Sequence, residues 1–187
     1  KGGDYRESDL EALAIVDDTI YAIINDWLEK AYLKGRKSTV FFCVSVLHAN
    51  KMALFLQNQG VSAACVTAET PMDEREDILG RFEEGTLSAL CNVAVLTEGW
   101  DAPRTDCIAL LRPTKSLGLY VQICGRGMRP WPDKDDCLLL DYGGNMGRHG
   151  CIDVARPERN KKDDEVVDKE MIWICDECLS VNDIDDK

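Results

Sequence analysis

Two arginines three positions apart, Arg126 and Arg129, are the residues of this chain whose chemistry is easiest to interpret. On a helix, positions i and i+3 lie on one face, so both guanidinium groups would point in the same direction. Gln122 would lie one turn earlier on that face, and Gly125 would let a ligand or another backbone approach closely. Paired guanidinium groups suit phosphate oxygens better than a core, although a solvated basic helix face is the alternative interpretation.

An apolar stretch upstream, residues 92–96, runs into the polar, glycine-containing segment 97–101. A buried strand that stops at such a turn marks the place where open α/β sheets bind their ligands. The two stretches together therefore favour a phosphate-binding site over a solvated surface.

The order of these stretches resembles motifs V and VI of superfamily 2 helicases, and is close to the DEAD/DEAH-type DNA repair helicases related to XPB. The resemblance covers roughly residues 36–150. It is carried by Leu-Thr-Glu-Gly-Trp-Asp-Ala-Pro at 96–103, Arg-Pro-Thr-Lys-Ser at 112–116, Gln-x-x-Gly-Arg-x-x-Arg at 122–129, Leu-Asp-Tyr-Gly-Gly-Asn at 140–145 and Arg-His-Gly at 148–150. Each piece alone is a weak signal, but their combination in this order is specific.

In the family that the chain resembles, ATP and Mg²⁺ bind in a cleft between two RecA-like domains. The N-terminal domain supplies a P-loop lysine and an Asp-Glu pair, and neither is identifiable in this sequence. The resemblance thus implies a C-terminal domain whose partner is an N-terminal RecA-like domain of the same protein. It also implies that Arg126 and Arg129 reach the γ-phosphate, while Gln122 contacts that phosphate or the attacking water. The other residues expected at the nucleotide are Gly99, Asp101 and Gly125.

The resemblance also implies binding of nucleic acid, with DNA as the expected substrate and RNA as an open alternative. Binding would be mainly to phosphates, and therefore largely independent of sequence. The residues expected to contact nucleic acid are Ser45, His48, Arg75 and Thr97. For His48 the alternative is an ordinary surface histidine, and for Arg75 it is a salt bridge within its own helix.

Short apolar runs alternate with helical patterns between residues 39 and 141, which predicts an α/β fold with a parallel, doubly wound sheet flanked by helices. The resemblance implies that this sheet is RecA-like. The strands are expected at 39–44, 61–66, 88–96, 107–111 and 137–141. Helices are expected at 8–34 (interrupted near 17–19), 45–59, 70–84 and from Thr114 or Ser116 to Arg129. The expected helix N-caps include Ser8, Asp18 or Thr19, and Thr70, which is followed by Pro71.

Three regions are expected: a helical linker at 1–35, a helicase C-terminal RecA-like domain at 36–150 and a charged, acidic tail at 151–187. The helical linker should pack against, or connect to, whatever precedes residue 1. In the tail, Cys175 and Cys178 have the spacing of half of a four-cysteine zinc site, and an unremarkable surface pair is the alternative.

The net charge of −12 argues at first sight against nucleic acid, but the charge is unevenly distributed. Residues 1–35 and 151–187 are strongly acidic, whereas residues 87–132 carry five basic and three acidic side chains. This distribution permits a phosphate-binding face in the region of the motifs.

The nine cysteines are odd in number and several lie in apolar runs, which indicates reduced core residues of a cytoplasmic protein. We expect no signal peptide, because the first residues are polar, and the sequence contains no apolar run long enough to span a membrane. Because it does not start with Met, we expect it to be part of a longer chain.

The sequence therefore predicts the C-terminal motor domain of an ATP-dependent superfamily 2 DNA helicase or translocase. Without a P-loop, the chain alone is not expected to hydrolyse ATP. One alternative is the duplex-translocating segment of a restriction or chromatin-remodelling enzyme. Another is a non-catalytic nucleic-acid-binding module that kept the RecA-like fold.

Overall fold

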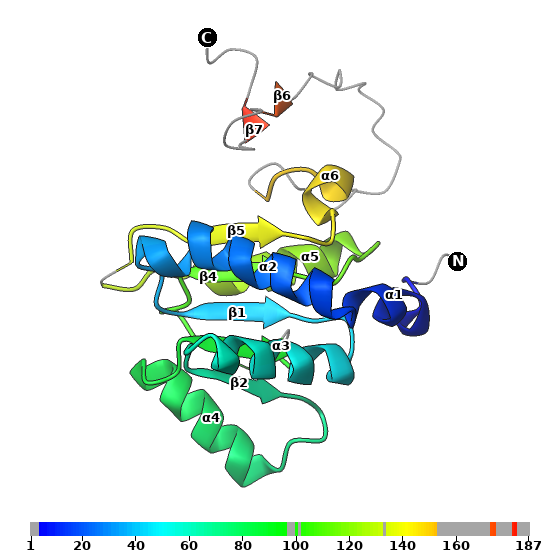
Figure 1. Cartoon of the computed structure of the whole chain (residues 1–187). Helices are drawn as coiled ribbons and strands as arrows, with labels where there is room; N and C mark the ends of the chain where they lie inside the picture. The colour runs from blue at the N-terminus through cyan, green and yellow to red at the C-terminus, as the bar shows by residue number, and fades with distance from the viewer. Residues whose placement is uncertain are drawn as a thin grey trace.

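The computed structural model describes residues 4–96, 100, 102–132, 134–152, 173–174 and 181–182. Its centre is a five-stranded parallel sheet in the order β2-β3-β1-β4-β5 (Figure 1). The strands are β1 (Thr39–Phe42), β2 (Ala63–Val66), β3 (Ala89–Asn92), β4 (Cys107–Leu110) and β5 (Leu138–Asp141). This architecture confirms the predicted parallel, doubly wound α/β fold.

Helices cover both faces of the sheet (Figure 1). They are α1 (Glu7–Ala14), α2 (Asp17–Lys30), the 3₁₀ turn η1 (Tyr32–Lys34), α3 (Val46–Asn58), α4 (Met72–Glu84), α5 (Leu117–Gly127) and α6 (Asn145–His149). Successive side chains of β1 point to opposite faces. Phe41 belongs to the apolar cluster under α2 and α3, whereas Val40 and Phe42 belong to the cluster under α4 and α5.

Strand β3 ends four residues earlier than the sequence predicts, at Asn92 instead of Leu96. Ala94 has a φ of 57°, a left-handed backbone conformation that is incompatible with a strand. The chain therefore leaves the sheet after Asn92. Leu96 and Trp100 are then buried in the cluster under α4 and α5.

Helix α2 is an integral layer of the domain, in addition to any linking role that the N-terminal segment has. Ile20, Ile24 and Trp27 are fully buried in the same cluster as Phe41 of β1. The indole Nε1 of Trp27 donates a hydrogen bond to Oγ1 of Thr39 at 3.1 Å, which fixes the helix on the first strand. The described domain thus begins before residue 36.

Several expected helix starts are wrong by a few residues. Ser8 lies inside α1, and α2 starts at Asp17 with Val16 as its N-cap. Thr70 does not cap α4, because its Oγ1 accepts a hydrogen bond from the Thr67 N–H at 2.9 Å and the helix starts only at Met72. By contrast, Ser116 caps α5 and is one of the two expected starts of that helix, Thr114 being the other.

Two short strands from the tail, β6 (Trp173–Ile174) and β7 (Val181–Asn182), pair with each other in antiparallel orientation. Within the described parts of the chain, no helix combines the length and apolar character needed to cross a membrane.

Candidate nucleotide and nucleic-acid site

Helix α5 carries three of the predicted phosphate-binding residues, Gln122, Gly125 and Arg126, and Arg129 follows its end. Oγ of Ser116 accepts a hydrogen bond from the Leu119 N–H at 3.2 Å, which starts the helix. One face is buried against the sheet through Tyr120, Ile123 and Cys124, while Gln122 is exposed on the other side. The polar face of this helix is therefore separate from its core face, as the sequence predicts.

The helix ends at Gly127, so Arg126 and Arg129 do not share a helix face as predicted. Arg129 precedes Pro130, and a residue before proline is sterically disfavoured in the helical conformation. Arg126 thus comes from the last turn of α5, and Arg129 from the turn that follows it.

Arg126 connects the two predicted motifs. Its Nη1 donates a hydrogen bond to the backbone carbonyl of Trp100. Trp100 belongs to the crossing segment, the connection 93–106 between β3 and β4. Trp100 is itself buried and packs against Phe82 of α4 with ring centroids 5.7 Å apart. A guanidinium group carries its N–H donors in a planar fork, a geometry that suits phosphate oxygens. Of the predicted motif V residues, Thr97, Gly99 and Asp101 lie outside the described residues.

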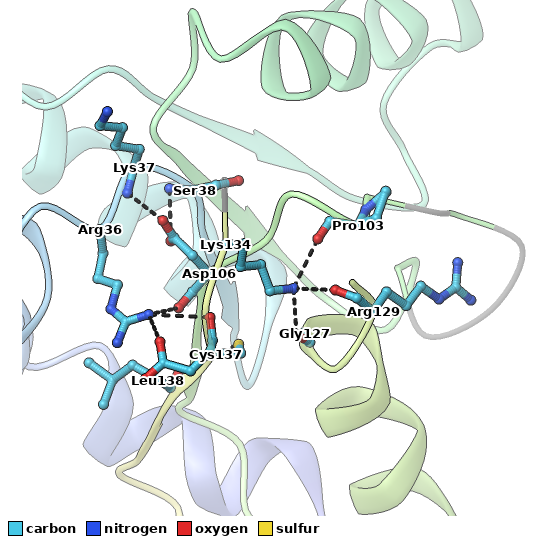
Figure 2. Close-up of polar contacts among 11 residues, drawn as sticks. Arg36, Lys37, Ser38, Pro103, Asp106, Gly127, Arg129, Lys134, Cys137 and Leu138 are labelled. Carbon is cyan, nitrogen blue, oxygen red and sulfur yellow. Dashed lines mark hydrogen bonds and ion pairs between the residues drawn. The ribbon is translucent and has the colours of Figure 1, made fainter. Parts of the chain in front are cut away.

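Lys134 is a residue of this region that sequence reasoning missed. Its Nζ donates hydrogen bonds to three backbone carbonyls, those of Pro103 at 2.9 Å, Gly127 at 2.7 Å and Arg129 at 2.7 Å (Figure 2). Partial burial lowers the pKa of Lys134. No local pattern indicates this role, because Lys134 lies among acidic residues that are typical of a solvated turn.

A second polar cluster lies beside Lys134 at the amino ends of the strands (Figure 2). The carboxylate of Asp106 accepts hydrogen bonds from the Lys37 N–H at 2.8 Å and the Ser38 N–H at 3.0 Å. Arg36 donates to the Asp106 carbonyl at 3.2 Å and pairs with the carboxylate of Asp136. Arg36, Asp106, Lys134 and Asp136 line a cavity of about 420 Å³. The hydrogen bonds of this cluster hold the starts of β1, β4 and β5 together.

Ser45 and His48, expected at nucleic acid, have local structural roles at the carboxyl end of β1. Ser45 is buried, and its Oγ accepts a hydrogen bond from the His48 N–H at 3.2 Å at the start of α3. The alternative of a surface histidine is wrong, because His48 is only 1% exposed and its Nδ1 faces the Val44 N–H at 3.4 Å. Burial lowers the pKa of His48 to about 4, so its ring is neutral near pH 7.

Arg75 is half-buried near the start of α4, and its Nη2 donates to the carbonyl of Thr67 at 2.7 Å. In the part of the chain that the structure describes, no carboxylate of α4 pairs with it, so the expected alternative of an intrahelical salt bridge is wrong. Contacts of Ser45, His48 and Arg75 with nucleic acid stay predictions.

The carboxyl ends of β4 and β5 are joined by Asn145, the last residue of the predicted segment 140–145. Its buried side chain accepts from the Thr114 N–H at 2.8 Å and donates to the Arg112 carbonyl at 3.0 Å and to Asp141 Oδ1 at 3.1 Å. The N-terminal segment joins this network through Asp4, which accepts from the Thr114 hydroxyl and the Lys115 N–H, both at 2.9 Å. The predicted segment 140–145 therefore has a structural role, which is to join the carboxyl ends of β4 and β5.

The zinc prediction is not tested, since Cys175 and Cys178 lie outside the described residues. Among the side chains that the structure describes, no group of three or more metal-ligating residues comes together.

Comparison with known proteins gives this geometry a family context. Residues 22–130 match the helicase conserved C-terminal domain. Over 141 residues, the chain is 35% identical to "Putative ATP-dependent helicase IRC3" of Saccharomyces cerevisiae, covering 75% of this chain and 20% of that protein. The chain thus spans about a fifth of the length of this curated relative.

Many solved structures are similar to this chain, and two of them are informative. One is a fragment of a "putative HsdR subunit of a type I restriction enzyme from Vibrio vulnificus YJ016", with 25% identity and a TM-score of 0.65, covering 81% of this chain and 31% of that chain. The other is the E. coli DEAD-box protein SrmB, bound to regulator of ribonuclease activity A. Its 18% identity and TM-score of 0.56, over 71% of this chain and 76% of that chain, show the fold alone.

The residues matched by the family include α5 and the Trp100 segment to which Arg126 is bonded, and they make up more than half of the chain. The chain therefore belongs to the helicase conserved C-terminal domain family, the RecA-like C-terminal domain of superfamily 2 helicases.

Proposed function

We propose that this domain completes the ATP site of a nucleic-acid motor, by supplying Arg126 and Arg129 to an ATP molecule held by a separate N-terminal RecA-like domain. The observation that carries the proposal is the bond from Arg126 to the Trp100 carbonyl. It joins the end of α5 to Trp100, a residue of the predicted segment 96–103, and this link supports a role of both segments in one site. Gln122, exposed on α5, is the proposed contact to the γ-phosphate or the attacking water.

The proposed chemistry is electrostatic rather than covalent. Charge on the transferred phosphoryl group must be stabilised in the transition state, and an arginine supplies that charge with a rigid, planar set of donors. Mg²⁺ would bind with ATP and the N-terminal domain. Of the two arginines, we assign the main role to Arg126, because its position is fixed by a helix and by the Trp100 carbonyl.

The test uses the whole protein, including its N-terminal domain. We expect Arg126→Ala to lower ATP turnover by about 10³-fold to 10⁵-fold while ATP still binds, because the lost interaction is made mainly in the transition state. Arg126→Lys should not restore turnover, since lysine lacks the planar fork. Arg129→Ala should resemble Arg126→Ala, and the double variant should be much less than additive.

Arg81→Ala is a matched control, because Arg81 is an exposed arginine of α4 whose ion-pair partner, Asp77, lies one turn away. Its turnover should stay at the wild-type level. Turnover within a few-fold of wild type in Arg126→Ala would refute the proposed role. Loss of ATP binding together with a lower melting temperature would show that Arg126 is structural.

The nucleic acid that we propose as the substrate is DNA. Membership of the XPB-related group of DNA repair helicases stays a prediction. The alternative of a duplex translocase is favoured by one observation, the similarity to the restriction-enzyme fragment. A strand-displacement assay beside a triplex-displacement assay separates them: a helicase separates strands, whereas a translocase displaces only the third strand. A non-catalytic module would show neither activity and no ATP turnover.

A zinc site at Cys175 and Cys178 is a separate proposal, based on their spacing. Metal analysis of the whole protein, compared with a Cys175→Ser/Cys178→Ser variant, should show the loss of about one zinc ion per chain. Equal zinc content in the two proteins would leave the surface-pair alternative.

A further inference from the structure

Lys134 makes an unusually complete set of contacts for a lysine. An ammonium group has three N–H donors, and here all three are matched by backbone carbonyls at 2.7–2.9 Å. The acceptors come from two different segments. Gly127 and Arg129 lie at and just beyond the end of α5, whereas Pro103 lies in the crossing segment, as Trp100 does.

The local sequence explains why these carbonyls need a donor. The last carbonyls of a helix have no partner within the helix, and Pro130 and Pro132 have no N–H with which to satisfy them. The chain instead turns back after Arg129. The Lys134 N–H bonds the Trp131 carbonyl at 3.1 Å, which directs the lysine side chain toward the end of α5. A positive charge at the C-terminal end of a helix is also favoured by the helix dipole.

We propose that Lys134 is a positioning residue for ATP hydrolysis, which fixes the end of α5 against the crossing segment so that Arg126 and Arg129 are held in their working geometry. The inference rests on the function proposed above. Arg129 is positioned directly through its own carbonyl, and Arg126 through the neighbouring residue Gly127. Lys134 would not contact ATP, because its three donors are used within the domain.

Two other cations of the same end of the sheet show why Lys134 is distinctive. Arg104 donates to the carbonyls of Phe82 and Glu83 at the end of α4, and Arg36 donates to those of Asp106 and Asp136 at the starts of β4 and β5. These carbonyls belong to segments without a predicted phosphate-binding residue. Lys134 alone among these three cations bonds both the end of α5 and the crossing segment.

The experiment compares Lys134→Met, Lys134→Gln, Arg36→Met and Arg126→Ala in the whole protein, measuring kcat and KM for ATP and the melting temperature. In Lys134→Met we expect kcat to fall by about 10-fold to 100-fold with KM within about threefold of wild type, because small displacements of catalytic groups lower turnover by up to that amount. Lys134→Gln keeps two donors and should give a smaller loss of kcat. If Lys134→Met does not fold, Lys134→Gln carries the test.

Arg36→Met is the matched control, since it removes a cation from carbonyls of the same edge and should lower the melting temperature with kcat near wild type. An equal fall of kcat in Arg36→Met and Lys134→Met, or an unchanged kcat in both Lys134 variants, would overturn the positioning role. The Arg126→Ala variant distinguishes failure of the positioning role from failure of the proposed function. If Arg126→Ala is inactive and the Lys134 variants are fully active, only the positioning inference fails; if Arg126→Ala is active, the proposed function fails and the inference with it.

Discussion

The helix termini at the two ends of the central sheet bind opposite kinds of polar side chain. At the carboxyl end, where helices begin, side-chain oxygens accept hydrogen bonds from backbone N–H groups, as Ser45, Ser116 and Asp141 do. At the amino end, where helices finish, cationic side chains donate to backbone carbonyls, as Arg104 and Lys134 do. The difference follows from the direction of the chain, because a helix leaves free N–H groups at its start and free carbonyls at its end.

This comparison changes how the basic segment 87–132 is interpreted. Most of its basic side chains make contacts within the domain: Arg104 with carbonyls of α4, Arg112 with Asp4, Lys115 with the ring of Tyr5, and Arg126 with the Trp100 carbonyl. A local excess of positive charge in a parallel α/β domain can therefore serve the fold. It does not by itself mark a nucleic-acid face, and the assignment to phosphate must come from the position of each arginine.

The carboxyl end should be most sensitive to loss of Asn145. Asn145→Ala removes three hydrogen bonds and leaves the Thr114 N–H and the Arg112 carbonyl without this partner. We expect the free energy of unfolding to fall by about 3 kcal/mol, measured by urea denaturation of the domain. Asn50→Ala, at an exposed position of α3, is the control and should change it by less than about 0.5 kcal/mol. A loss below about 1 kcal/mol in Asn145→Ala would mean that the carboxyl end does not depend on this network.

His48, at the carboxyl end of the sheet, should make the stability of the domain depend on pH. The unfolded chain has the ordinary histidine pKa of 6.5, whereas burial lowers the pKa of His48 in the folded state to about 4. Between these values the unfolded state binds more protons, so the stabilising effect is complete above pH 6.5 and is lost as pH falls toward 4. We expect the titration of His48 to lower the free energy of unfolding by about 2 kcal/mol between pH 7 and pH 5.

His48→Asn provides the comparison for this prediction, because its amide oxygen can replace Nδ1 as the acceptor for Val44. Denaturation at pH 7, 6 and 5 should give a flatter profile for this variant than for wild type. Parallel profiles would show that His48 does not cause the loss.

Two glycines near the end of α5 test the packing at the amino end of the sheet. A Cβ on Gly127 would meet Sγ of Cys137 and lie 2.9 Å from Cδ1 of Ile108, whereas a Cβ on Gly125 would meet nothing within 4 Å. Gly127→Ala should therefore destabilise the domain by about 1–2 kcal/mol through overpacking. Gly125→Ala should leave its stability unchanged or raise it by up to about 1 kcal/mol.

Turnover by the whole protein sharpens this comparison. Gly125 is predicted to lie close to the nucleotide, so Gly125→Ala should lower turnover without lowering stability. Full activity of Gly125→Ala would remove Gly125 from the predicted site.

The sequence predicted those features that depend on local chemistry. Alternating apolar runs and helical patterns located all five strands, and two candidate capping residues, Thr114 and Ser116, placed the start of α5 within a few residues. The end of α5 also depends on local chemistry, because Pro130 disfavours the helical conformation at Arg129.

Features that depend on distant partners could not be predicted. Lys134 bonds the carbonyl of Pro103, which is brought close only by the fold, and nothing in the local sequence distinguishes this lysine from a solvated one. The pattern of Ile20, Ile24 and Trp27 indicated an apolar helix face but not that the sheet is its partner. The same holds for His48, whose burial follows from the packing of α3 on the sheet.

The strand order has a consequence for how the chain folds. The central strand β1 is formed from the earliest part of the sheet sequence, yet Thr39 pairs with Ala89 on one side and with Cys107 on the other. Both edges of this apolar strand stay open until long loops have closed, and loop closure of this kind makes folding slow. During synthesis, α2 and α3 are the elements available early to cover one face of β1, while its other face and both edges wait for later segments. Val40, Phe41 and Phe42 are therefore the residues most exposed to aggregation before the domain is complete.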